Sequence, residues 1–278
     1  MTTKKALSRV IFWVALSLLF NVGIYFFMGQ QRALEFFGGY IIELSLSLDN
    51  LFVFLMIFSC FGIGQDYQRR VLNYGIIGAV VLRLIFIVLG VAMVKKFEWI
   101  LYVFGAILIV SGIRMILPNK EQVNFKESKL LKWMSKLIPF TENLEGERFF
   151  IRKEKVLYAT PLFAILVLIE SSDVIFAIDS IPAVFSVTTN TFIVYTSNIC
   201  AILGLRSMYF LLQKLHSAFS LVKYGVALIL IFTGVKLAIL MFHIEIPLLT
   251  SIAVIMGLLL ASIVASVLFK RRELNTAA

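Results

Sequence analysis

Residues 170–180 read Glu-Ser-Ser-Asp-Val-Ile-Phe-Ala-Ile-Asp-Ser and so place three carboxylates inside a long apolar run. An earlier apolar run contains residues 43–52, which read Glu-Leu-Ser-Leu-Ser-Leu-Asp-Asn-Leu-Phe. The two stretches share the pattern Ser-x-Asp-x-x-Phe, with its aspartates at Asp49 and Asp173. Chance seldom matches an aspartate within apolar sequence, so the shared pattern indicates an internal repeat.

Other matches at nearly the same offset extend this repeat along both halves of the chain. They pair Arg83 with Arg206, Phe97 with Phe219, Tyr102 with Tyr224, Gly112 with Gly234, and Arg114 with Lys236. We expect three helices in each copy, over residues 38–117 and 157–242. Because three is odd, the second copy would enter the membrane from the opposite side, as in the inverted repeats of many transporters.

The composition indicates the class of protein. Of the 278 residues, 60% are hydrophobic and 15% are charged, and the mean hydropathy is +0.96. Soluble domains are about half apolar and about a quarter charged. The composition excludes a disordered chain, a disulfide scaffold and a nucleic-acid-binding module, and it predicts an all-α polytopic membrane protein.

Eight apolar runs are long enough to cross a bilayer. They cover residues 10–29, 38–62, 72–94, 98–117, 157–180, 192–213, 221–242 and 247–269. The first and last runs flank the two repeats, within residues 1–30 and 247–278. The chain between the repeats, 118–156, is predicted to be a loop.

Lysine and arginine are distributed unevenly around these runs. Segments on the side of the two termini carry 19 of them, and the opposite segments carry three, Arg32, Lys95 and Lys96. Basic residues stay on the cytoplasmic side of a membrane. We therefore expect both termini in the cytoplasm, and the formal net charge of +10 has a topological explanation.

The loop contains a basic amphipathic segment between residues 126 and 138. Its apolar residues recur at helical spacing and lysines interleave with them: Leu130, Leu131, Trp133, Met134, Leu137 and Ile138, with Lys126, Lys129, Lys132 and Lys136. The pattern is typical of a helix on the inner leaflet. Two roles remain open for it, an anchor in the lipid bilayer and a docking site for membrane-protein partners.

Five of the 16 acidic residues lie inside the expected spans, on the equivalent helix of each repeat: Glu43, Asp49, Glu170, Asp173 and Asp179. Each charged group at a span centre costs about 3 kcal/mol on insertion. Arg83 and Arg206 could neutralise two of the five, and protonation or a bound cation would resolve the rest. The alternatives are packing residues satisfied by the two arginines, and a purely proton-conducting role.

The spacing of these acids predicts which of them share a helix face. Glu170 and Asp173 are three residues apart and share one. Asp173 and Asp179 are six apart, and about 240° of rotation separates them on an unbroken helix. We expect Pro182 to end the helix just after Asp179. Glu43 and Asp179 are therefore candidate gate carboxylates, or ligands that a local break brings in.

The expected midplane is rich in oxygen donors. The supporting polar residues there are Asn50, Ser47, Ser171, Arg83 and Arg206. An oxygen-only ligand set suits Mg²⁺, Ca²⁺ or Mn²⁺ better than Zn²⁺ or Cu⁺. No Walker A, Gly-x-Ser-x-Gly or His-Glu-x-x-His motif is present, so we expect neither an enzyme nor a permanently bound cofactor. An intramembrane aspartyl protease could pair Asp49 with Asp173, but it would leave the other three acids without a role.

The stretches 43–50, 170–183 and 204–210 resemble the signatures of the TerC/Alx family of integral membrane proteins, and the likeness covers nearly the whole chain. The family was named for tellurium resistance. The resemblance implies export of Mn²⁺ from the cytoplasm, with related transporters that handle Mn²⁺ or Ca²⁺, and a role in supplying metal to secreted proteins. It also implies that the carboxylates of both motifs hold the metal, namely Glu43, Asp49, Glu170 and Asp173, with Asp179 as a further candidate.

Together with this resemblance, the sequence predicts a secondary transporter of the bacterial inner membrane that exports a divalent cation through a midplane site between the repeats. Mn²⁺ is the substrate by resemblance, with Ca²⁺ and Mg²⁺ as the other candidates, and excess acid would permit exchange with protons. The rival prediction is a non-transporting membrane scaffold, which would act in tellurium or envelope stress or in metal delivery to secreted proteins.

Overall fold

The computed structural model describes residues 3–97, 99–117, 129–141, 144, 146–153, 156–215, 221–242, 244 and 246–276. Within these ranges, the side chains of Asp49 and Arg206 are among those that it does not describe.

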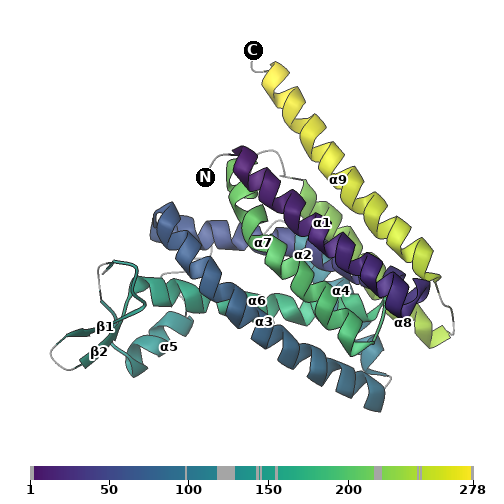
Figure 1. Ribbon diagram of the computed structural model, residues 1–278, viewed down its shortest axis with the longest axis horizontal. Coiled ribbons are helices and arrows are strands. Elements are labelled where there is room, and N and C mark those ends of the chain that lie inside the picture. The colour runs from purple at the N-terminus through teal and green to yellow at the C-terminus, as the bar shows by residue number, and fades with distance from the viewer. Residues whose placement is uncertain are drawn as a thin grey trace.

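Long helices account for most of the described chain (Figure 1). They are α1 (Thr3–Met28), α2 (Gln30–Phe61), α3 (Gln65–Lys96), α4 (Ile100–Ile116), α6 (Pro161–Phe185), α7 (Thr191–Leu215), α8 (Val222–Ile239) and α9 (Leu248–Thr276). The shorter elements are α5 (Lys129–Leu137), β1 (Phe150–Lys153), β2 (Val156–Ala159) and a 3₁₀ turn, η3 (Leu240–Phe242). Each of the eight predicted apolar runs coincides with one long helix. Gly29 and Gly62, with φ of 87° and 63°, turn the chain at the two ends of α2.

Five of the described helices are long and apolar enough to cross a bilayer: α1, α3, α6, α8 continued into η3, and α9. Helix α7 adds a sixth if its two parts, Thr191–Leu205 and Ser207–Gln213, which are bent by 43°, count as one span. Helix α4 has 17 residues and is a shorter apolar helix. The all-α membrane architecture is therefore confirmed, and the count of eight spans stays a prediction.

The boundaries of the 157–180 run were predicted wrongly at both ends. Residues 156–159 form β2, which pairs antiparallel with β1, and α6 begins at Pro161, where a missing backbone N–H costs nothing. At the other end Pro182 lies inside α6, which continues to Phe185. Val184 and Phe185 are buried in the core, and their packing stabilises the last turn beyond the proline.

Helices α4 and α8 pack at close backbone distance through small residues. A Cβ built on Gly105 would lie 2.8 Å from the carbonyl oxygen of Gly234, and one built on Gly112 would lie 2.7 Å from that of Ala227. The offset of the repeat maps Gly105 onto Ala227 and Gly112 onto Gly234. The repeat offset therefore maps the contact between Gly105 and Gly234 onto the contact between Ala227 and Gly112. This is the relation expected if a two-fold axis relates the two predicted repeats.

Strands β1 and β2 and helix α5 lie together at one end of the molecule (Figure 1). The segment before the hairpin contacts the start of α3, where Arg70 Nη1 lies 3.0 Å from a Glu147 carboxylate oxygen and Tyr74 packs edge-on against Phe149. Helix α5 lies within the predicted amphipathic segment, whose residues 126–128 fall outside the described chain. Its Trp133 is 60% exposed.

Candidate functional site

A buried polar cluster joins four helices at the centre of the bundle. Arg83, on α3, donates from Nη1 to Glu43 Oε1 on α2, to Ser180 Oγ on α6 at 3.2 Å, and to Asn198 Oδ1 on α7 at 3.1 Å. Asn198 Nδ2 donates to Glu43 Oε2 at 2.9 Å, and Ser47 Oγ donates to Glu43 Oε1 at 3.3 Å. We call these five residues the Glu43 cluster. It ties helices of the first predicted repeat to helices of the second.

The ion pair at the centre of this cluster is closed to solvent. The Glu43 side chain is fully buried, and both of its carboxylate oxygens accept hydrogen bonds from protein donors. Burying two charges is expensive, and removal of one partner strands the other at a cost of about 3–5 kcal/mol. Arg83 was expected to neutralise one of the five intramembrane acids, and that acid is Glu43.

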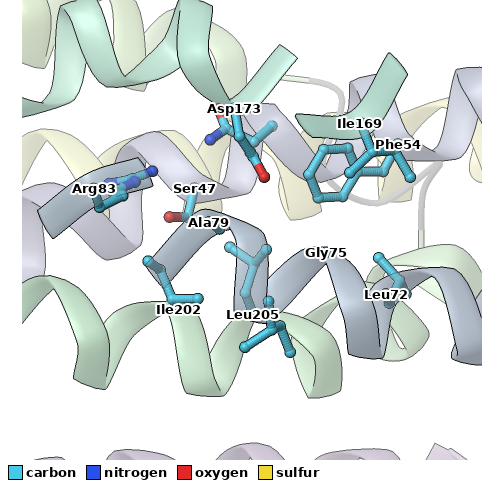
Figure 2. Close-up of a pocket in the computed structure, with 12 residues that line it drawn as sticks. Ser47, Phe54, Leu72, Gly75, Ala79, Arg83, Ile169, Asp173, Ile202 and Leu205 are labelled. Atoms are coloured by element: carbon cyan, nitrogen blue, oxygen red, sulfur yellow. The ribbon is translucent and has the colours of Figure 1, made fainter. Parts of the chain in front are cut away.

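Asp173 lines a small cavity beside the Glu43 cluster (Figure 2). The cavity has a volume of about 20 Å³, which is room for one water-sized body. Ser47, Asn50 and Arg83 supply its other polar groups, and the rest of the wall is apolar and comes largely from α3 and α7. Asp173 is 8% exposed, and no hydrogen bond or ion pair joins its carboxylate to another described residue.

Glu170 lies one turn before Asp173 on α6 and packs against α3 at Gly75 and Gly78. These two glycines leave a space in the surface of α3 that we call the glycine notch. A Cβ at Gly78 would overlap the Glu170 carboxylate, and one at Gly75 would lie 3.6 Å from its Oε1. The Oε2 atom is buried and has no hydrogen-bond partner in the described structure. Gly75 also lines the Asp173 cavity, so the two acids approach α3 from neighbouring positions on one helix face, as their spacing predicts.

Asp179 lies in a different place from the other two acids of α6. Its carboxylate accepts a hydrogen bond of 2.8 Å from Ser111 Oγ on α4. Both residues line a second cavity of about 430 Å³ between α2, α4, α6 and α8, together with Arg114. Asn50 lines this cavity as well as the Asp173 cavity. Because α6 is unbroken, Asp173 and Asp179 do not converge on one point.

Comparison with known proteins identifies the chain as an integral membrane protein. The family model described as "Integral membrane protein TerC family" matches residues 28–274.

The chain belongs to the TerC family.

Its relatives in this family are bacterial proteins. It is 47% identical over 272 residues to a Salmonella typhi protein named "Putative membrane-bound redox modulator Alx", a match that covers 95% of this chain and 84% of the relative. The Escherichia coli K12 protein of the same name is 46% identical, with the same coverage. An uncharacterised membrane protein of Myxococcus xanthus is 47% identical over 96% of this chain and 84% of its own length. No solved structure matches the chain.

The remaining predicted site residues of this TerC-family chain fall into two groups. Asp49 and Arg206 lie in α2 and α7, and their side chains lie outside the described part. Ser171 donates to the backbone oxygen of Leu168 at 2.9 Å rather than into a cavity. Among the described side chains, no three of His, Cys, Asp or Glu are grouped closely enough to hold a metal ion.

Sequence reasoning missed the glycine notch and the cavity around Asp179. Gly75 and Gly78 are three residues apart in an apolar helix, and this spacing puts them on one face. That signal marks a close contact, but it does not say that a carboxylate fills the space. The hydrogen bond from Ser111 to Asp179 joins helices far apart in the sequence, so no local pattern indicates it.

Proposed function

We propose that this TerC-family protein is a secondary transporter that exports divalent cations, with Mn²⁺ as its substrate. The observation that carries the proposal is the Asp173 carboxylate, which is buried and unpaired among the described residues and faces a cavity with room for one ion or water. The choice of Mn²⁺ over Ca²⁺ or Mg²⁺ rests on the resemblance to the family.

The balance of charge supports a cation at this position. The ion pair of Glu43 with Arg83 neutralises two charges, whereas no described cation forms an ion pair with Asp173, Glu170 or Asp179. An ionised carboxylate in a low-dielectric interior requires a counter-charge or a proton. A divalent cation and protons can therefore alternate on the same acids, which is the chemical basis for exchange.

The atoms around the cavity suit a hard cation. The Asp173 carboxylate, the Asn50 amide oxygen and the Ser47 hydroxyl are oxygen ligands. Ser47 donates its proton to Glu43, so the lone pairs of its oxygen are free to face an ion. Asp49 precedes Asn50 in the chain and is the further ligand that the repeat predicts.

The other acids have separate roles in this proposal. Glu43 holds the Arg83 guanidinium and is a positioning residue rather than a ligand in this conformation. Glu170, with one oxygen unsatisfied beside the cavity wall, takes up the proton or completes the ligand set as the helices move.

Transport needs two arrangements of the helices, and the repeat supplies them. The Glu43 cluster links α2 and α3 to α6 and α7, so rocking of one three-helix repeat against the other would open and close this link. The glycine contact between α4 and α8 would be the pivot. We place the protein in the inner membrane with both termini in the cytoplasm, because of the distribution of its basic residues.

The test is Mn²⁺ flux into proteoliposomes that contain the purified full chain. We expect the wild type to carry Mn²⁺ and Asp173→Asn to lose at least about tenfold of the flux, since each 1.4 kcal/mol of lost ion binding is tenfold. Asp66→Asn is the matched control, because the Asp66 side chain is 83% exposed at the start of α3. Wild-type flux in Asp173→Asn would overturn the proposal.

The exposed edge of α5 favours a second candidate, the scaffold function. Trp133 and Leu137 are 60% and 63% exposed and one helical turn apart, with Lys132 and Lys136 also exposed beside them. The relatives' name of redox modulator is compatible with action through a partner. On this reading, Trp133→Ala with Leu137→Ala would abolish function in cells, and purified wild-type protein would move no ion.

A further inference from the structure

One residue, Asn50, is shared by the walls of the Asp173 cavity and the Asp179 cavity. Asn50 lies on α2, is 3% exposed and lines both of them. Within the described chain, no side-chain hydrogen bond involves its amide. Burial of an unpaired amide costs about 1–3 kcal/mol, so a partner such as water or an ion is expected at one or both of its faces.

Asp179 is also incompletely satisfied by the protein. Ser111 is its single hydrogen-bond donor among the described residues, whereas an ionised carboxylate offers about four lone-pair sites. Such a group does not face lipid, because a charge exposed to the hydrocarbon is costly. An ionised Asp179 therefore requires water in the cavity of about 430 Å³ in front of it.

The two cavities differ greatly in size. The one at Asp173 has room for about one water molecule, and the one at Asp179 has many times that volume. An ion can keep its hydration shell in the larger cavity but must lose most of it to enter the smaller one. Six residues of unbroken α6 separate the two acids, which is a rise of about 9 Å along the helix.

We propose that Asp179, Ser111 and Asn50 form a second, hydrated cation site next to the Asp173 cavity. The inference rests on the proposed function and adds a second binding position to it. The divalent cation binds here with its water shell, and it passes Asn50 when it loses that shell to reach Asp173. Asp179 binds through water, and Asn50 offers its amide oxygen to the ion from both cavities.

Arg114 sets the strength of this second site. It is exposed on the wall of the larger cavity, where its positive charge opposes a bound cation. A position on a conduction route must bind an ion favourably enough to receive it and weakly enough to release it. Arg114→Gln is therefore expected to tighten Mn²⁺ binding at Asp179 and to slow release.

The test measures access to the larger cavity with a thiol reagent. Met115→Cys, at another position on the wall of the larger cavity, is made in the full chain with Cys60→Ser and Cys200→Ser, and a cationic methanethiosulfonate labels the introduced thiol. We expect labelling from water, and we expect millimolar Mn²⁺ alone to slow it at least threefold. Asp179→Asn should remove this protection, and Asp173→Asn should leave it in place. Choline chloride at the same ionic strength controls for screening, and Asp66→Asn controls for the change of charge.

Flux measured on the same proteins separates the two ideas. Asp179→Asn should lower Mn²⁺ flux at least fivefold in the wild-type background. If wild-type protein carries no Mn²⁺, the proposed function fails. The second site alone is overturned in a different case, in which wild-type protein carries Mn²⁺ and Asp173→Asn does not. In that case the contradicting result is either that Mn²⁺ does not slow labelling of the thiol, or that it still slows labelling in Asp179→Asn.

Discussion

Asp173 and Asp179 lie six residues apart on one unbroken helix, yet they line different cavities. Asp173 faces α3 and α7 across a space for one ion, and Asp179 faces α4 across a space for an ion and its water. The helix geometry that keeps them apart makes them suitable for successive steps rather than for one coordination shell.

The ion pair of Arg83 with Glu43 predicts strongly non-additive stability. Arg83→Met leaves the fully buried Glu43 carboxylate without its cation and should cost about 3–5 kcal/mol, with a clear fall in Tm in detergent. The double variant Arg83→Met with Glu43→Met should recover most of that loss, because no charge is then stranded. Equal losses in the single and double variants would show that the stranded Glu43 charge is not what destabilises Arg83→Met.

The notch at Gly78 predicts a specific effect of one methyl group. Gly78→Ala would push the Glu170 carboxylate out of its place and should lower Mn²⁺ flux at least tenfold, with the protein still inserted. Gly23→Ala is the control, because a Cβ there meets nothing within 4 Å. The same overlap should lower the Tm of Gly78→Ala, and adding Glu170→Ala should restore Tm but not flux. Normal flux in Gly78→Ala would remove Glu170 from the mechanism.

The reciprocal contact between α4 and α8 predicts equal effects at repeat-related positions. Gly112→Ala would bring a methyl group to 2.7 Å from the Ala227 carbonyl oxygen, and Gly105→Ala would make the equivalent clash at Gly234. Each should destabilise the protein by about 1–3 kcal/mol, measured as a fall in Tm. Gly257→Ala, which meets no atom within 4 Å, should have no such effect. A large loss at one position and none at the other would contradict the two-fold relation.

Topology can be tested at turns that tolerate insertion. Glu35, near the start of α2, accepts a hydrogen bond of 2.7 Å from Thr188, which follows α6, so these two positions lie on one side. Reporters placed after Gly29 and after residue 189 should read as extracytoplasmic, and one after Gly146 should read as cytoplasmic. The reverse pattern would invert the direction of export.

The sequence predicted the long helices well because their apolar runs are uninterrupted over a bilayer's thickness. It also predicted that Arg83 pairs with one of the intramembrane acids. It failed at residues 156–159, where apolar Val156 and Leu157 belong to a hairpin and not to the helix that begins at Pro161. Hydropathy alone does not distinguish a short apolar strand from the start of a span, although the proline marked the boundary.

The arrangement of the acids could be predicted only in part. The spacing of the acids predicted that Glu170 and Asp173 share one face of the helix and that Asp179 lies on another. The structure agrees, because Glu170 and Asp173 both approach α3 whereas Asp179 lines a different cavity. Most partners of these acids lie far away in the sequence, such as Arg83 and Asn198, which are 40 and 155 positions from Glu43. Those contacts arise from the packing of helices, and a local pattern does not contain them.

The central claim is that Asp173 holds the transported ion, and equilibrium binding of Mn²⁺ to the purified full chain tests it most directly. Isothermal titration of the wild type should show saturable Mn²⁺ binding, with Asp173→Asn weaker by at least about tenfold and Asp66→Asn unchanged. Wild-type affinity in Asp173→Asn, with the protein folded to the same Tm, would contradict the account.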